Sequence, residues 1–353
     1  MLGQRIKRAR LAHGWSLRKL AEKVGLSHNA IKKYEHGDTT PESNKLIKLA
    51  KALGVRVEYF LRPDTPMLTH IEFRSHHKLP KKFINVIEAK VLDEFERRAE
   101  LESILPQYKV PEYSPPAIFH QMLVSLDVVE TFANRIREHW GLGTRPIVDL
   151  VDLLERHGIR VFFTDKFDEA FDGLYANVSN HPLIVICHTW AGERQRFTLA
   201  HELAHILLKP ILDKSLDIEK ACNRFAAAFL LPNVEVINAV GETRKNIEPR
   251  ELAILKKEFG ISMTAILYRL KELEVINTST FTKYLKEFKE KGWIRTEPTK
   301  PYPKEHLYFQ ELLVFRAYAE NLIGDAKAAE LLGLTQCEFQ RLKAMEGIDD
   351  NSG

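Results

Sequence analysis

A short motif of histidine and glutamate is the part of the sequence with the clearest chemical use. His201, Glu202 and His205 form an H-E-x-x-H sequence inside the apolar run RFTLAHELAHILL, which predicts a helix. Histidines at positions i and i+4 share one helix face, so both imidazoles can bind a single metal ion. Glu202 follows the first histidine and can act on a water at that ion instead of binding it. The motif therefore predicts a zinc site for hydrolysis, with Glu202 as general base.

A catalytic zinc ion needs a third protein ligand, and the next expected helix, IEKACNRFAAAFLL, offers one. Glu219 lies at its start and Asn223 one turn later. This spacing suits a carboxylate ligand followed by a group that orients a ligand histidine. We therefore predict zinc bound by His201, His205 and Glu219, with Asn223 itself or an upstream acid as alternatives for the third ligand. In the opposing interpretation, Glu202 is an ordinary surface residue and the histidines are hydrogen-bonded polar groups.

The elements that must position this motif are mostly helices. We predict helices at 123–139 and 146–157, then strands at 159–164, 173–179 and 182–188, directly before the metal-binding helix. Residues 234–353 are expected to be helical, with helices at 248–259 and 262–273. The fold class is therefore mainly α with a small mixed β-sheet (α+β). Strand 182–188 is a candidate edge for pairing with an extended substrate, and Tyr175 and His188 are candidates for stabilising an oxyanion.

This region resembles the ImmA/IrrE metallopeptidases. The resemblance rests on FDGLYANVSNHPLIVICHTWAGERQRFTLAHELAHILL, followed by E-x-x-x-N-R-F-A-A-x-F-L-L-P, and covers about residues 125–240. It implies a zincin-like domain that cleaves phage-type or stress-response repressors in bacteria, so the implied protein substrate is a partner repressor. It also implies the same three zinc ligands and the same base. The sequence departs from the family at Cys222, which we expect to pack against neighbouring helices.

The N-terminal segment has a different character. Residues 1–62 carry a net charge of +9, whereas the remainder carries −5, which suggests a module that binds a polyanion. The first helix is expected at 2–12, with Arg5, Arg8 and Arg10 facing solvent. Ser16 and Ser27 are good N-caps for two further helices, and Gly25 makes the turn between them. Two short helices joined in this way fit a helix-turn-helix, whose second helix enters the DNA major groove.

The run GWSLRKLAEKVGLSHNAIKKYEHGDTTPESNKLIKLAKALGV strongly resembles the phage-repressor-like (Xre/Cro) helix-turn-helix domains. The resemblance covers essentially residues 1–62, although Leu17 stands where many members carry glutamine. It implies binding to an operator in double-stranded DNA. The alternative is a helical dimerisation domain without DNA. The implied base contacts come from His28, Asn29 and Lys32, and the implied phosphate contacts from Arg18, Lys19 and Lys33.

The rest of the chain connects or follows these two modules. Pro63 and Pro66 mark a boundary, and a long amphipathic helix is expected at 79–104. We predict four segments: a DNA-binding domain at 1–62, a linker and helical arm at 63–122, the peptidase domain at 123–240, and a helical region at 241–353. The sequence AAELLGLTQCEFQRL, at 328–342, has two interpretations. It is either a second motif, for DNA binding or assembly, or a segment that only packs against the rest of the chain. No internal repeat is evident.

Composition narrows the function classes. The sequence lacks an apolar run of 18 residues and a signal-peptide pattern, so we expect no membrane association. Three widely spaced cysteines suggest reduced, mostly buried thiols and a cytoplasmic location. The predicted function is that of a DNA-binding transcriptional regulator with a zinc-dependent endopeptidase domain. A homodimer is one possible assembly of the chain. The alternative is a repressor or antitoxin whose zinc domain is a non-catalytic sensor or protein-binding platform.

Overall fold

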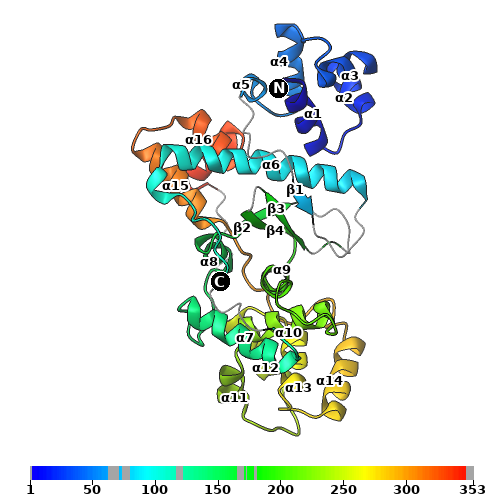
Figure 1. The fold of residues 1–353 in the computed structure, drawn as a ribbon, viewed down its shortest axis with the longest axis vertical. Coiled ribbons are helices and arrows are strands. Elements are labelled where there is room, and N and C mark those ends of the chain that lie inside the picture. Colours follow the sequence, from blue (N-terminus) through cyan, green and yellow to red (C-terminus); the bar gives the residue numbers. More distant parts are fainter. Residues whose placement is uncertain are drawn as a thin grey trace. The chain divides into compact units, whose positions relative to one another are not determined.

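The computed structural model describes residues 2–62, 71–73, 80–116, 122–164, 171, 173–178 and 181–346 (Figure 1). The Pro63–Pro66 boundary lies outside these residues. The described chain is mainly helical with a small mixed sheet, which confirms the predicted fold class. Two compact units are present: the first contains chiefly residues 1–109 and 313–344, and the second chiefly residues 110–177 and 181–312. Every described helix is too short or too polar to span a lipid bilayer.

Five helices form the N-terminal head, which we define as residues 2–62. Ser16 and Ser27 cap helices as predicted, because each hydroxyl oxygen accepts a hydrogen bond from the backbone N–H three residues later. Gly25 ends the second helix in the left-handed conformation, with φ 68°. Ile6, Leu20 and Ile31 lie at the centre of the core. The helices are α1 (Leu2–Ala12), α2 (Leu17–Val24), α3 (His28–His36), α4 (Ser43–Ala52) and α5 (Val57–Leu61).

The expectation that Arg5 and Arg10 face solvent is wrong, because both side chains are buried in ion pairs. Arg5 donates to both carboxylate oxygens of Glu96, at 2.8 and 3.3 Å. Arg10 donates to those of Glu35, at 2.6 and 2.7 Å. A charged group is tolerated inside a protein when a hydrogen-bonded counter-ion compensates its lost hydration. The helical pattern of α1 assigns charges to solvent because it contains no information about such distant partners.

A long helix, α6 (Lys81–Ile104), lies close to its predicted range of 79–104 and organises the rest of the first unit. Through Glu96 it contacts α1, and through Glu100 it accepts a hydrogen bond from Lys327 at 2.7 Å. A second core joins the end of α6 to the C-terminal helices around the buried Phe339. The other elements are β1 (Ile71–Phe73), the 3-10 turn η2 (Pro106–Tyr108), α15 (Tyr308–Ala319), α16 (Asp325–Leu332) and α17 (Gln336–Lys343).

The second unit is built around a small sheet and the helices that follow it. Its strands are β2 (Arg160–Thr164), β3 (Gly173–Val178) and β4 (His181–Cys187), in the order β3-β4-β2. β2 and β4 are parallel, and Arg160 is paired with Leu183. β3 and β4 run antiparallel, since two residues separate them. β4 therefore has a neighbour on each side, and the prediction that strand 182–188 offers a free edge to substrate is wrong.

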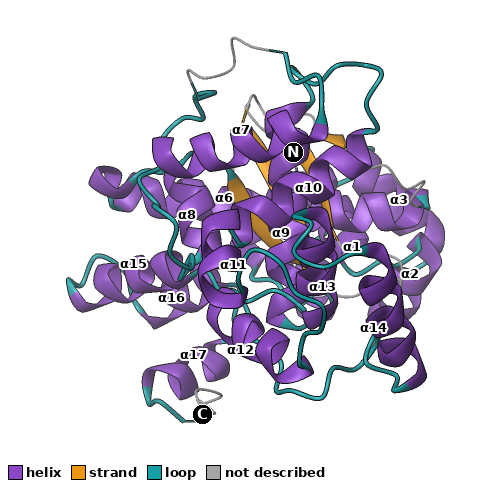
Figure 2. Cartoon of the chain, turned by 90° about the horizontal axis from the view of Figure 1, so that it is seen from below, coloured by secondary structure: helices purple, strands orange, loops and turns teal. Residues whose placement is uncertain are grey.

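Eight helices of this unit share one apolar core that extends from Leu123 to Phe288. Figure 2 shows how few strands accompany the helices. Cys187 and Cys222 are buried, as expected for most thiols, whereas Cys337 of the first unit is exposed. The helices are α7 (Leu126–His139), α8 (Leu150–Arg156), α9 (Gly192–Leu208), α10 (Ile218–Leu230), α11 (Asn233–Val240), α12 (Pro249–Phe259), α13 (Met263–Glu272) and α14 (Thr278–Glu290).

An irregular segment, residues 297–305, fixes the first turns of α9. Glu193 on α9 accepts a hydrogen bond from the backbone N–H of Tyr302 at 2.9 Å. Arg196, fully buried, forms an ion pair with Glu305. The second carboxylate oxygen of Glu305 accepts the N–H groups of Leu150 and Val151, at 3.0 and 3.2 Å, at the start of α8. One carboxylate thus joins α8, α9 and a segment more than a hundred residues later in the chain.

Candidate functional site

Helix α9 places His201 and His205 side by side. Its core-facing residues, including Leu199, Leu203 and Leu207, are fully buried, so the rotation of the helix is fixed. The two histidines lie one turn apart, and their Nε2 atoms are 3.1 Å from each other. His205 is almost fully buried, whereas His201 is partly open to solvent. The two imidazoles therefore present nitrogen atoms to a shared point at the protein surface.

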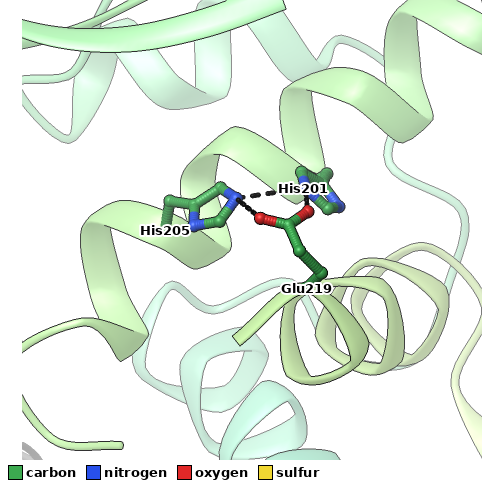
Figure 3. Close-up of side chains that lie close together, drawn as sticks. All are labelled: His201, His205 and Glu219. Carbon is green, nitrogen blue, oxygen red and sulfur yellow. Dashed lines mark hydrogen bonds and ion pairs between the residues drawn. The ribbon is translucent and has the colours of Figure 1, made fainter. Parts of the chain in front are cut away.

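Helix α10 brings Glu219 to the same point (Figure 3). Asp217 caps α10 by accepting the N–H of Glu219 at 3.0 Å, which fixes the helix start. The carboxylate oxygens of Glu219 lie 3.3 Å from Nε2 of His201 and 3.5 Å from Nε2 of His205. One donor atom from each residue can be chosen so that all lie within 4.8 Å of one another.

These distances fit a tetrahedral zinc ion. Bonds of about 2.0–2.1 Å to nitrogen or oxygen place two ligands of a tetrahedral ion about 3.3–3.4 Å apart. The Nε2–Nε2 separation of 3.1 Å and the 3.3 Å between Oε2 of Glu219 and Nε2 of His201 are close to that value, whereas the 3.5 Å contact with His205 is made by the other carboxylate oxygen, Oε1. Imidazole nitrogen and carboxylate oxygen are also donors that zinc prefers. The His201–His205–Glu219 group, called the donor triad below, is thus suited to a divalent metal.

Each histidine of the donor triad has a partner for its other ring nitrogen. Nδ1 of His201 lies 3.0 Å from Oδ1 of Asn223, the residue predicted to orient a ligand histidine. Nδ1 of His205 lies 3.4 Å from Sγ of Cys222, a contact that the sequence analysis missed. Burial, together with the nearby carboxylates of Glu219 and Glu202, raises the pKa of Cys222. Such partners fix the orientation and tautomer of metal-binding imidazoles.

The three other candidate residues, Glu202, Tyr175 and His188, do not all lie at the donor triad. Glu202, next to His201 on α9, is 9% exposed. The Tyr175 ring stacks on His205 with centroids 5.4 Å apart, and its hydroxyl oxygen accepts a hydrogen bond from Lys209 at 3.4 Å. His188 instead lies beyond the end of β4, where Nδ1 is 3.0 Å from the carbonyl oxygen of Thr164. The structure therefore places the Tyr175 ring against His205 of the triad, whereas His188 contacts Thr164.

The contact between Asn223 and His201 makes a specific prediction for metal affinity. Asn223→Ala removes the group beside Nδ1 of His201, and loss of such an orienting partner typically weakens metal binding about 10–100-fold. Titration of zinc against a chelator of known affinity measures the change. Lys220→Ala on the exposed side of α10 is the matched control and should keep wild-type affinity. Equal affinities for Asn223→Ala and wild type would show that the amide does not support a ligand.

The candidate DNA contacts are exposed polar residues on α2 and α3 of the head. α3 turns Ile31 and Tyr34 into the core, which leaves its opposite face to solvent. The residues predicted to contact DNA are all exposed: His28, Asn29, Lys32 and Lys33 on α3, and Arg18 and Lys19 on α2. Arg5 and Arg10 are neutralised by buried carboxylates. The basic charge available to DNA is therefore smaller than the sequence count suggests, and α2 and α3 carry five of the exposed basic residues.

Comparison with known proteins assigns both modules. Residues 6–60 match the helix-turn-helix family, and residues 154–271 match the peptidase family described as the IrrE N-terminal-like domain. The chain is 39% identical over 114 residues to the radiation response metalloprotease IrrE of Deinococcus deserti, which covers 29% of this chain and 39% of that protein. It is 33% identical over 73 residues to the SPbeta prophage-derived uncharacterized HTH-type transcriptional regulator YonR of Bacillus subtilis, which covers 21% of this chain and 63% of that protein.

A third relative, the HTH-type transcriptional regulator ImmR of Bacillus subtilis, is 29% identical over 93 residues, or 26% of this chain and 69% of that protein. The chain spans less than two thirds of the length of the first two relatives. Both resemblances seen in the sequence are confirmed at the level of domains. The chain joins a helix-turn-helix domain to an IrrE-like metallopeptidase domain, and the latter implies a divalent metal.

Proposed function

We propose that this chain, which joins a helix-turn-helix domain to an IrrE-like domain, is a cytoplasmic DNA-binding regulator that cleaves a partner repressor. The observation that carries the peptidase part is the donor triad, which offers two imidazole nitrogens and a carboxylate oxygen within 4.8 Å of one another. In this proposal, His201, His205 and Glu219 hold zinc. When bound, zinc polarises the scissile carbonyl and makes water acidic enough to ionise near neutral pH.

Residues of the chain supply the other steps. Glu202 accepts the proton of the attacking water and passes it to the leaving amine. Its low exposure, 9%, keeps bulk water away from the carboxylate. Asn223 and Cys222 hold the imidazoles of His201 and His205 in orientation. Tyr175, stacked on His205, is the candidate donor to the developing oxyanion.

The proposed substrate is a separate repressor, cut in an exposed, extended segment. Two relatives support this choice, because one is titled a metalloprotease of the radiation response and the other a helix-turn-helix transcriptional regulator. The test is to incubate the zinc-loaded chain with candidate repressors and to identify fragments by mass spectrometry. A fragment that requires zinc supports the proposal. The same fragments in chelator-treated samples, or none from any repressor of the host, would reject it.

The head is proposed to bind an operator in double-stranded DNA, with His28, Asn29 and Lys32 at base edges. Asn29→Ala is expected to cost about 1–3 kcal/mol at one base pair, because asparagine pairs bidentately with adenine. Arg18, Lys19 and Lys33 are assigned to phosphates. Lys33→Ala should therefore weaken all sequences alike and reduce the slope of log K against log salt by about 0.9.

Fluorescence anisotropy with labelled duplexes at several salt concentrations measures both effects. The matched control is Lys286→Ala on the exposed face of α14, which should bind like the wild type. An affinity that does not change with salt would exclude this mode of DNA binding. If Asn29→Ala has the same base preference as the wild type, another residue makes the base contact.

A further inference from the structure

We propose that α15, α16 and α17 form a second helix-turn-helix, which contacts bases in the same operator as the head. The inference rests on the proposed DNA binding of residues 2–62, and it concerns a part of the chain outside both family matches. It starts from a repeat in the structure. The sequence analysis found no internal repeat; the likeness lies in the helices and in the turns between them.

The repeat has a constant offset of 308 residues. α2 spans Leu17–Val24 and α16 spans Asp325–Leu332, while α3 begins at residue 28 and α17 at residue 336. The turn glycines correspond as well. Gly25 has φ 68° and ψ 37°, and Gly333 has φ 70° and ψ 23°. In each helix pair, therefore, a glycine in the left-handed conformation makes the turn between the two helices.

The hydrogen bonds around the two turns also agree. Ser27 accepts the N–H of Ala30 at 3.1 Å, and Thr335 accepts that of Glu338 at 3.2 Å, so the second helix of each pair has the same cap. The backbone N–H after each glycine donates to the carbonyl five residues earlier, at 3.0 and 2.8 Å. Sequence comparison misses this likeness because residues 19–35 and 327–343 share only five identities, which are Lys19/Lys327, Ala21/Ala329, Glu22/Glu330, Gly25/Gly333 and Leu26/Leu334.

A third helix completes each group. In the head, α1 packs so closely on α3 that a Cβ added to Gly3 would lie 2.2 Å from the carbonyl oxygen of Tyr34. In the C-terminal group, α15 contacts α17 through Phe315 and Tyr318, whose rings lie 5.7 and 5.5 Å from that of Phe339. Phe339 is fully buried. Each group thus has the three-helix core on which a helix-turn-helix depends.

The outer face of α17 carries side chains that can read bases. Under the 308-residue offset, the base-contacting positions proposed for α3 correspond to Gln336, Cys337 and Gln340, and the phosphate-contacting Lys33 corresponds to Arg341; all four residues are exposed. Glutamine can pair bidentately with adenine. Phe339 is the buried residue of α17, so the core does not require this polar face.

Charge distinguishes the two groups and sets the order of binding. Residues 2–36 contain nine basic and two acidic residues, whereas residues 308–343 contain four basic and five acidic ones. Lys327 is already paired with Glu100 and Glu330, at 2.7 and 3.2 Å. The C-terminal group therefore has little attraction for phosphates and reads bases after the head has captured the duplex. It should contribute to sequence preference but hardly to salt dependence.

Both groups are anchored to one helix. Arg5 of α1 pairs with Glu96, and Lys327 of α16 pairs with Glu100, one turn further along α6. Adjoining turns of a continuous helix keep a fixed separation, so the two reading helices move together. A fixed separation of reading helices predicts an operator with two conserved blocks at constant spacing.

The test is selection of duplexes from a random library by the full chain and three paired variants. Wild type and the control Lys286→Ala/Lys289→Ala should select two blocks of bases. Gln336→Ala/Gln340→Ala should select only the block read by the head and should bind the two-block duplex about tenfold more weakly for each lost bidentate contact. Its salt slope should equal that of wild type. Both glutamines are exposed, and Gln340 forms one side-chain hydrogen bond with Asp325, so thermal unfolding should change little.

A fourth result separates this inference from the proposed function. Arg18→Ala/Lys33→Ala should lose selection altogether, since these residues are assigned to the phosphate contacts by which the head captures the duplex. If the head variant fails while the glutamine variant still selects both blocks, the second helix-turn-helix does not read DNA, and its polar face is assigned to a protein partner or to solvent. If wild type selects no sequence, the proposed DNA function itself is rejected.

Discussion

The Glu202→Gln variant is expected to keep its metal and its DNA affinity while losing at least about 10²–10⁴-fold in the rate of peptide cleavage. Glutamine has the size of glutamate and retains a hydrogen-bonding oxygen, but it cannot accept the proton of the attacking water. The donor triad does not include Glu202, so zinc content should stay at one ion per chain. DNA affinity should stay because the reading residues lie in a separate compact unit.

The measurement follows repressor fragments over time for wild type, Glu202→Gln and a matched control, Glu290→Gln. Glu290 is an exposed glutamate on α14, and its variant should cleave like the wild type. Zinc analysis of the same samples verifies that the loss is one of chemistry. Equal regulation in cells by wild type and Glu202→Gln, without a zinc-dependent fragment from either, would favour a non-catalytic sensor or platform.

Removal of a member of the donor triad is expected to abolish stoichiometric zinc binding. Glu219→Ala leaves two imidazoles, and His205→Ala leaves one imidazole and a carboxylate, so neither retains the three protein ligands of a catalytic site. Elemental analysis after dialysis against a weak chelator should give one zinc ion per wild-type chain and a small fraction of that for each variant. The solvent-exposed Glu290→Ala serves as the control for loss of a carboxylate.

Full zinc occupancy in Glu219→Ala would contradict this assignment. It would indicate that Asn223 or an upstream acid is the third ligand. Full occupancy in His205→Ala would contradict the triad as a whole, because His205 shares contacts with both other members. Far-UV circular dichroism should match wild type for Glu219→Ala, whose side chain is 45% exposed.

Local patterns in the sequence predicted the elements that local forces determine. The caps at Ser16 and Ser27 follow from hydrogen bonds that span three residues, and the spacing of His201 and His205 follows from one helical turn. The position of Asn223 one turn after Glu219 could also be predicted, because both residues lie on the same helix. The predicted segments 1–62, 63–122, 123–240 and 241–353 remain a prediction, for which limited proteolysis is the test.

Contacts between distant residues were not predictable in the same way. Arg5 is paired with a glutamate 91 residues away, so its burial is invisible in the helical pattern of α1. The contact between Cys222 and His205 depends on how α10 rotates against α9. The neighbours of β4 depend on the order of strands in the sheet, which hydrophobic runs do not encode.

The pairing of Arg196 with Glu305 has a consequence for the timing of synthesis. The two residues are 109 positions apart, and ribosomes add about 5–20 residues per second, so α9 waits roughly 5–20 s for its counter-ion. During that interval the nascent chain already contains the complete DNA-binding head. A ribosome that stops before residue 297 therefore releases a chain whose head is complete. In that chain, Arg196 on α9 has no carboxylate to compensate its buried charge. Translation therefore supplies the counter-ion of α9 long after it completes the head.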